Sequence, residues 1–155
     1  MKLIFGIIIF LVLGIMIYLF TLAYISKSKP APGLLSDLLS KCPPTPNCVC
    51  SEFKADNLHY IDPIHYAENQ SSVVFKKIKN TLQSMNGKII SENETYIAAT
   101  FTSSIFGFVD DFEVRLDKEQ RIIHIRSASR VGRGDMNANN KRATEFENKL
   151  EHALQ

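Results

Sequence analysis

The sequence lacks an excess of charge of either sign, because 18 lysines and arginines face 16 acidic residues and the net charge is only +2. Proteins that bind nucleic acids normally present a strongly basic face, so we predict no nucleic-acid partner. Internal repeats and low-complexity tracts are also missing from the sequence. The 155 residues leave room for one domain of roughly 100 residues once the N-terminus is set aside.

Charge is absent altogether from residues 3–25, "LIFGIIIFLVLGIMIYLFTLAYI". At about 1.5 Å per residue, a helix of this length spans the roughly 30 Å hydrocarbon core of a bilayer. A cleaved signal peptide is the alternative, because the small residues of "TLA" at positions 21–23 suit a signal peptidase. The apolar part of a signal peptide normally runs only about 7 to 15 residues. We therefore predict that residues 1–29 are an uncleaved membrane anchor, with residues 3–25 in contact with lipid.

The positive charges that flank this segment nearly balance, with Lys2 and the α-amino group before it and Lys27 and Lys29 after it. A single N-terminal anchor with a two-residue tail usually leaves the following domain outside. We expect a single-pass protein of the cell membrane whose soluble domain lies on the periplasmic or extracellular side.

Residues 30–61 contain most of the prolines, a composition that extends the backbone and resists a packed core, so we predict a linker that ends in a cysteine clasp. Five residues separate Cys42 from Cys48, and the prolines between them turn the chain enough to bring the two side chains within disulfide reach. This pairing requires the oxidising side of the membrane. Cys50 is left over as either a buried small side chain or a reactive thiol.

Two stretches of the remaining chain have the apolar spacing of amphipathic helices. The first lies between residues 62 and 87, and the second is "NKRATEFENKLEHALQ" at the C-terminus. In the first stretch the apolar positions that recur at steps of three and four are Val74, Ile78, Leu82 and Met85. Asn137 or Asn139 is suited to cap the N-terminus of the second helix.

Between the two predicted helices, apolar and polar residues alternate with a period of two, which predicts four antiparallel strands. In the third strand, Asp110 shares a face with Phe112, and Asp111 lies on the other face. The predicted register of the last two strands sets these residues opposite each other: Val114 and Ile123, Phe112 and Ile125, Asp110 and Ser127, Glu113 and His124, and Asp111 and Arg126.

A sheet with one apolar face needs a cover, and the two helical stripes supply it. We therefore predict an α+β fold in which an N-terminal transmembrane helix precedes a two-layer domain. This domain comprises residues 62–155, with a four-stranded antiparallel sheet covered by two helices.

Asp110 is an acid within a row of apolar side chains, and burying it without a partner would cost several kcal/mol. Ser127 and the arginines at positions 130, 133 and 142 stand close enough in the predicted fold to supply a hydrogen-bond donor. One interpretation is therefore a structural network that fixes the last loop against the sheet.

The second interpretation takes "SRVGRGDMNANNKR" as a cradle for a phosphate or carboxylate. Its glycines permit close backbone approach, its arginines form paired hydrogen bonds, and the last helix offers a positive N-terminus. The candidate ligand-binding residues are Arg130, Arg133, Asn137, Asn139 and Arg142. Their supporting shell would be Asp110, Asp111, Arg126, Ser127, Ser129, Gly132 and Asp135.

Other chemistry has little support in the sequence. The cysteines lack the ligand spacing of zinc sites, and we predict no metal, no cofactor and no catalytic residue. A hydrolase that uses Asp110 or Asp111 as a base, with arginines stabilising an oxyanion, is one alternative function. A structural subunit of a membrane complex is another, with Val109, Ile122 and Ala128 as an exposed interface.

The segments "CPPTPNCV", "FGFVDDFEVRLD" and "IRSASRVGRGDMNANNKR", in this order, resemble the family catalogued as domain of unknown function 1499 (DUF1499). The resemblance covers residues 42–154 and implies no activity, cofactor or partner. Cys50 departs from it, because relatives usually have serine there. The matching positions are Cys42, Pro46, Asn47, Cys48, Phe108, Asp110, Asp111, Arg126, Ser127, Ser129, Arg130, Gly132, Asp135, Asn139 and Arg142.

Taken together, these features predict a membrane-anchored envelope protein whose domain is a non-catalytic binding or accessory module. Its expected partner, besides the bilayer, is a small anionic ligand or an envelope protein.

Overall fold

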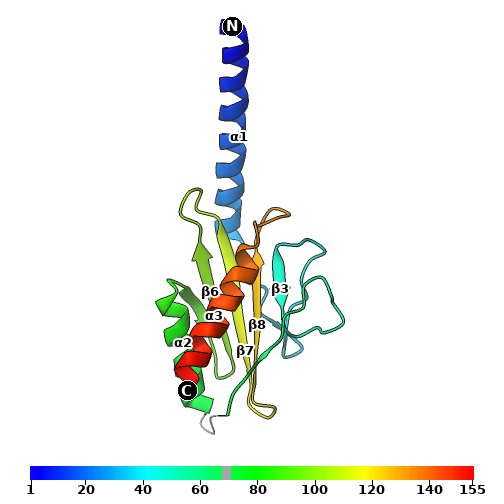
Figure 1. The fold of residues 1–155 in the computed structure, drawn as a ribbon, viewed down its shortest axis with the longest axis vertical. Coiled ribbons are helices and arrows are strands. Elements are labelled where there is room, and N and C mark those ends of the chain that lie inside the picture. Colours follow the sequence, from blue (N-terminus) through cyan, green and yellow to red (C-terminus); the bar gives the residue numbers. More distant parts are fainter. Residues whose placement is uncertain (68–70) are drawn as a thin grey trace.

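A long N-terminal helix projects from an α+β domain in the computed structural model, which describes residues 1–67 and 71–155 (Figure 1). The sheet is mostly antiparallel, and two helices cover one of its faces. The elements are α1 (Lys2–Ser28), β1 (Leu34–Leu35), β2 (Leu38–Leu39), β3 (Cys48–Cys50), β4 (Ile64–His65), α2 (Ser71–Ser84), β5 (Lys88–Glu92), β6 (Tyr96–Thr102), β7 (Val109–Asp117), β8 (Ile122–Ser129) and α3 (Ala138–Leu154).

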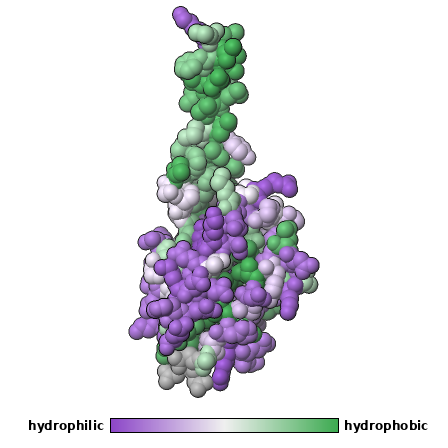
Figure 2. All heavy atoms as spheres, viewed as in Figure 1, coloured by the Kyte–Doolittle hydropathy of each residue, from purple (hydrophilic) through white to green (hydrophobic). Residues whose placement is uncertain are grey.

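Helix α1 is long and apolar enough to cross a membrane, a property that an N-terminal signal sequence shares. Hydrophobic side chains surround most of its length, whereas the visible surface of the domain is largely hydrophilic (Figure 2). Its last three turns touch the domain, where Ala23 and Ser26 are buried and Phe20 contacts Phe106. The helix therefore meets the sheet directly, through Ser26 and Val109.

The main sheet has six strands, so the prediction of four was wrong. Its order is β3-β8-β7-β6-β5, and β4 pairs with another part of β8. The missed strands are β3 and β4, which contain three and two residues. Strands this short carry too few residues to show a period of two, and β3 lies inside the proline-rich segment.

The predicted register of β7 and β8 was wrong by two residues. Asp110 pairs with Ser129, Phe112 with Ser127, and Glu113 with Arg126. The turn decides this offset. The backbone N–H of Gln120 donates to the Asp117 carboxylate over 2.9 Å, and Arg121 takes the left-handed conformation with φ 56°. A shift of two residues keeps every side chain on its predicted face.

The inner face of the sheet packs under α2 and α3 as the apolar spacing predicts. Val74, Ile78 and Leu82 of α2 are fully buried in this core. From the sheet, the ring of Phe112 meets the ring of Phe146 of α3 at a centroid distance of 4.9 Å. The prediction of two helices covering an antiparallel sheet is confirmed.

The outer face is also covered, which the prediction of two layers missed. The segment predicted as a linker folds back over it, and Leu39, Cys50, Tyr96 and Ala98 form a second apolar cluster there. The predicted disulfide between Cys42 and Cys48 is present, with the Cα atoms 5.7 Å apart.

A surface that was predicted to be exposed is also covered. Val109 and Ala128 are buried and Ile122 is half-buried, so the row proposed as an exposed interface for a partner subunit is not exposed. His124, which was predicted opposite Glu113, pairs with Arg115, and its side chain is only 12% exposed.

Candidate functional site

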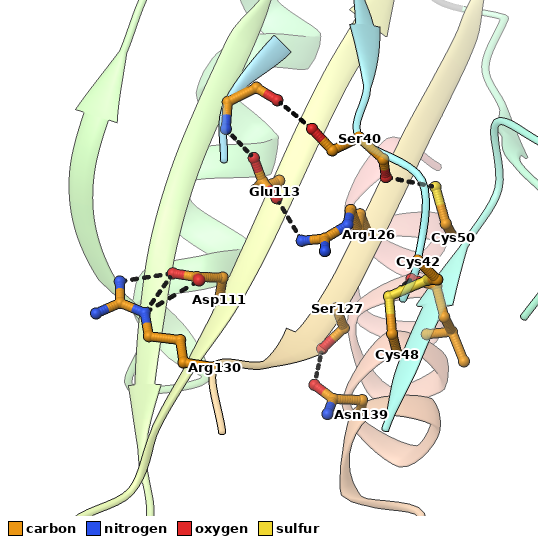
Figure 3. A network of polar contacts seen from close by, with 12 residues as sticks. Ser40, Cys42, Cys48, Cys50, Asp111, Glu113, Arg126, Ser127, Arg130 and Asn139 are labelled. Atoms are coloured by element: carbon orange, nitrogen blue, oxygen red, sulfur yellow. Dashed lines mark hydrogen bonds and ion pairs between the residues drawn. A yellow bond between two sulfur atoms is a disulfide. The ribbon is translucent and has the colours of Figure 1, made fainter. Parts of the chain in front are cut away.

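Three acidic residues of β7 belong to two separate polar networks. Consecutive strand residues point to opposite faces, so Asp110 lies on the inner face, whereas Asp111 and Glu113 lie on the outer face. Figure 3 shows Asp111 and Glu113 of β7 facing Arg130 and Arg126, and Ser127 of β8 facing Asn139. Each carboxylate meets its own arginine.

Asn139 is the centre of the inner network and is completely buried in the first turn of α3. Its Oδ1 accepts hydrogen bonds from Ser127 Oγ over 2.6 Å and from Arg142 Nη1 over 2.8 Å. Its Nδ2 donates toward the Asn47 carbonyl over 3.0 Å and Ser129 Oγ over 2.9 Å. One amide thus joins α3 to β8 and to the strand that carries the disulfide.

Asp135 caps α3, a role that we had predicted for Asn137 or Asn139. Its carboxylate accepts from the backbone N–H of Asn137 over 3.1 Å and of Asn139 over 2.8 Å. Asn137 occupies the N-cap position with φ 65°, but its side chain makes no capping bond. The positive end of this helix therefore already holds a carboxylate from the chain itself.

Asp110 finds its donor in Arg142, one of the three arginines that the sequence offered. Arg142 Nη2 donates to Asp110 Oδ2 over 3.1 Å, and the guanidinium stacks on the Phe101 ring at 4.8 Å. Burial raises the pKa of Asp110 above its usual value, and the charge of Arg142 opposes that rise. The arginine is fully engaged by an acid, a ring and an amide.

Arg130 and Asp111 form the most extensive contact of the outer network. Arg130 Nη2 donates to Asp111 Oδ1 over 2.6 Å, and Nε lies 3.0 Å from both carboxylate oxygens. The remaining amino group, Nη1, donates to the Ser26 carbonyl at the end of α1 over 3.1 Å. Both side chains are nearly buried, at 7% and 5% exposure. We call the contact among Arg130, Asp111 and Ser26 the clamp.

A second bond strengthens the clamp, because the backbone N–H of Val109 donates to Ser26 Oγ over 3.0 Å. Ser26 was missed in the sequence, since a single serine at the end of an apolar segment carries no signal of tertiary contact. It is the residue through which both β7 and the loop after β8 hold α1.

Glu113 is completely buried beside the clamp and pairs with Arg126, whose Nη1 donates to Glu113 Oε2 over 2.8 Å. The other oxygen accepts from the Tyr96 hydroxyl over 2.6 Å and from the Gly33 backbone N–H over 3.0 Å. Burial and the neighbouring Glu113 carboxylate raise the pKa of Tyr96, so its hydroxyl remains a donor. Through the bond from Gly33, this network ties the segment after α1 onto the sheet.

The structure does not bring all predicted site residues together. Arg133, Gly132 and Asn137 are exposed in the loop before α3. Within the described parts of the chain, no ion pair or side-chain hydrogen bond involves Arg133. The same parts contain no group of three or more histidine, cysteine or acidic side chains placed to hold a metal ion.

Cys50 lies in the apolar cluster of the outer face, and burial raises its pKa to about 11. At pH 8 its thiolate fraction is then about 100-fold smaller than that of an ordinary thiol. We expect the folded protein to react with iodoacetamide at least about 100-fold more slowly than a Ser104→Cys variant, because Ser104 is exposed. Rapid alkylation of native Cys50, followed by mass spectrometry, would contradict its role as an inert packing group.

Replacing Asn139 with alanine should destabilise the domain by about 2–3 kcal/mol, because buried groups such as Ser127 Oγ lose their partner. Urea unfolding of the variant measures this loss. Asn148→Ala is the matched control, since Asn148 is an exposed position of the same helix and should change stability by less than about 0.5 kcal/mol. Equal effects at the two positions would show that the amide does not organise the network.

Comparison with known proteins gives a family without an assigned activity. Residues 38–150 match the family model described as "Protein of unknown function (DUF1499)". No curated protein matches the chain. The matched range includes both polar networks, except for the contacts made by Ser26 and Gly33.

Proposed function

The chain belongs to the DUF1499 family of proteins of unknown function, and we propose from its own geometry that it is a single-pass membrane protein whose domain serves as a non-catalytic accessory module at the cell envelope. The observation that carries this proposal is the clamp, in which Arg130 joins Asp111 of β7 to the Ser26 carbonyl of α1. The networks then serve to hold the domain in one orientation on its anchor.

The contacts at the end of α1 support retention of the helix. Ala23 is buried against the domain, and the ring of Phe20 meets the ring of Phe106 at a centroid distance of 5.7 Å. A signal peptide that is removed after Ala23 would take both contacts with it. A helix that remains attached uses them to stabilise the junction.

The pairing of the arginines favours a structural role over an anion cradle. Arg130 and Arg142 are bound to Asp111 and Asp110, and the N-terminus of α3 is capped by Asp135. A phosphate entering this region would have to displace three carboxylates of the chain. The hydrolase alternative also loses support, because a general base needs access to substrate, and Asp110 and Asp111 are each held by an arginine.

The disulfide between Cys42 and Cys48 supports an external location for the domain. Such bonds persist on the oxidising side of a membrane and are rare in the cytosol. We therefore place the domain on the periplasmic or extracellular side.

Two measurements test this function in cells that express the full chain. Alkaline phosphatase fused after Gln155 should be active, because that enzyme needs an oxidising compartment to form its disulfides. The chain should also remain in the membrane pellet after extraction with alkaline carbonate. An inactive fusion would overturn the assigned side, and release into the supernatant would overturn the anchor.

A further inference from the structure

An open groove of about 480 Å³ lies beside the end of α1, on the part of the outer face that the N-terminal segment leaves uncovered. Its walls come from α1, from the segment after it, and from β5, β6 and β7. The residues that decide its chemistry are Lys27, Lys29, Lys88, Thr100 and Thr102. Neither polar network uses this groove, apart from the side of Arg130 that forms one edge of it.

The groove is positively charged, because three lysines line it and no acidic residue does. All three lysines are exposed, and none forms an ion pair within the described residues. Lys29 is positioned by a bond from Nζ to the Arg130 carbonyl over 3.2 Å, which leaves its charge uncompensated. Thr102 adds a hydroxyl beside the ammonium groups, whereas the hydroxyl of Thr100 donates to the Lys88 carbonyl over 3.5 Å. Ammonium and hydroxyl donors around an open space suit a phosphate group.

The loop beside the groove indicates how deep the groove would lie relative to a membrane. Residues 103–108 join β6 to β7 and run alongside the base of α1 (Figure 1). Phe106 of this loop meets Phe20, which lies five residues before the end of the apolar segment, or about 7–8 Å along the helix axis. Ile105 at the loop tip is 79% exposed. If α1 spans a bilayer, this apolar tip lies in its surface layer.

Lys27 and Lys29 follow directly after the apolar segment, so the groove lies at the level of the lipid headgroups. We propose that this groove binds the phosphate headgroup of an anionic phospholipid in the leaflet next to the domain. The proposal rests on the proposed function, because it requires α1 to be a retained anchor. The lysines bind the phosphate, and the neighbouring loop contacts the acyl chains.

The test uses the full chain in detergent, titrated with phosphatidylglycerol or phosphatidylcholine and observed by native mass spectrometry. We expect phosphatidylglycerol to be retained in preference to phosphatidylcholine. Each of Lys27→Gln and Lys88→Gln should weaken that retention about fivefold, as expected for a lysine near an anionic lipid surface. Lys118→Gln is the matched control, because Lys118 is exposed in the β7–β8 turn and should leave retention unchanged.

Three results would overturn the proposal. Equal retention of the two lipids, or retention that is unaffected by both groove variants, would exclude an anionic headgroup site. Displacement of phosphatidylglycerol by millimolar glycerol 3-phosphate would show that the groove takes a soluble phosphate ester instead. Carbonate extraction of membranes from the expressing cells separates the hypothesis of a lipid site from that of a membrane anchor. A chain that stays in the pellet but shows no lipid preference refutes only the lipid site in the groove. A chain that is released refutes the anchor as well.

Discussion

Replacing Arg130 with glutamine is expected to reduce the free energy of unfolding of the domain by about 3–5 kcal/mol, the usual result of removing one partner from a buried ion pair. Asp111 would keep its charge in a nearly buried position, and the Ser26 carbonyl would lose the donor that holds α1. The measurement is urea unfolding of the full chain in detergent, followed by the near-ultraviolet circular dichroism of buried tyrosines such as Tyr96.

Arg133→Gln is the matched control for this variant. It removes the same type of side chain from the same loop, but Arg133 is exposed and should contribute less than about 0.5 kcal/mol. If the two variants lose equal stability, or if Arg130→Gln stabilises the domain, then Arg130 is held ready for a ligand and the structural interpretation fails.

Replacing Glu113 with glutamine should have an effect of similar size, about 3–5 kcal/mol, because Arg126 would keep a buried charge without a counter-charge. Glutamine retains an oxygen that can accept hydrogen bonds from Tyr96 and Gly33. The loss of stability therefore reports the removal of the negative charge alone. The same urea experiment measures it, and Glu119→Gln in the exposed β7–β8 turn provides the control.

The second half of this experiment is the double variant Glu113→Gln with Arg126→Met, which removes both charges at once. We expect it to recover at least half of the stability that the single variant loses, since an apolar group in place of a buried ion often costs little. A double variant as unstable as the sum of the single variants would show that the two side chains act independently.

The inner face of the domain could be predicted from the sequence because its signals are local. Residues such as Ile78 and Leu82 recur with the helical period, and Phe112 and Ile125 with the strand period, so faces follow from spacing alone. The register could not be predicted in the same way. It depends on which turn residue takes a positive φ, and in this turn Arg121 does so while Asp117 accepts from the backbone N–H of Gln120.

The outer face could not be predicted because its cover comes from far away in the sequence. Glu113 has the sequence pattern of a solvent-facing strand residue, yet it is completely buried and accepts hydrogen bonds from Gly33 and Tyr96. A proline-rich segment gives no periodic signal of where it will dock. Another long-range contact is made at Val109, which was predicted as part of an interface and is buried where Ser26 of α1 meets β7.

The polar residues were predicted as a group but not as individual partners. The burial of Asp110 required a donor, and Arg142 was among the three arginines named for that role. Sequence alone could not separate Arg130 from Arg133, since the direction in which the loop turns decides which one reaches Asp111. Asp135 was expected in the supporting shell of a ligand site. Its capping bonds to α3 depend on the path of the same loop between β8 and α3.

The clamp has a direct consequence for motion, because it replaces a flexible connection with a fixed one. A domain held by Arg130 and Ser26 should keep one orientation relative to α1, and the groove should then stay at one depth. A domain on a free linker would tumble and could not hold its lysines at the headgroup level.

The most direct test is therefore a distance measurement between spin labels on α1 and α3 in lipid nanodiscs. Thr21→Cys and Asn148→Cys introduce exposed labelling sites, and the buried Cys50 should not compete for the label. Double electron–electron resonance should give one narrow distance distribution for this protein and a clearly broader one when Arg130→Gln is added. A broad distribution that Arg130→Gln does not change would contradict the claim that the clamp holds the domain in one orientation relative to α1.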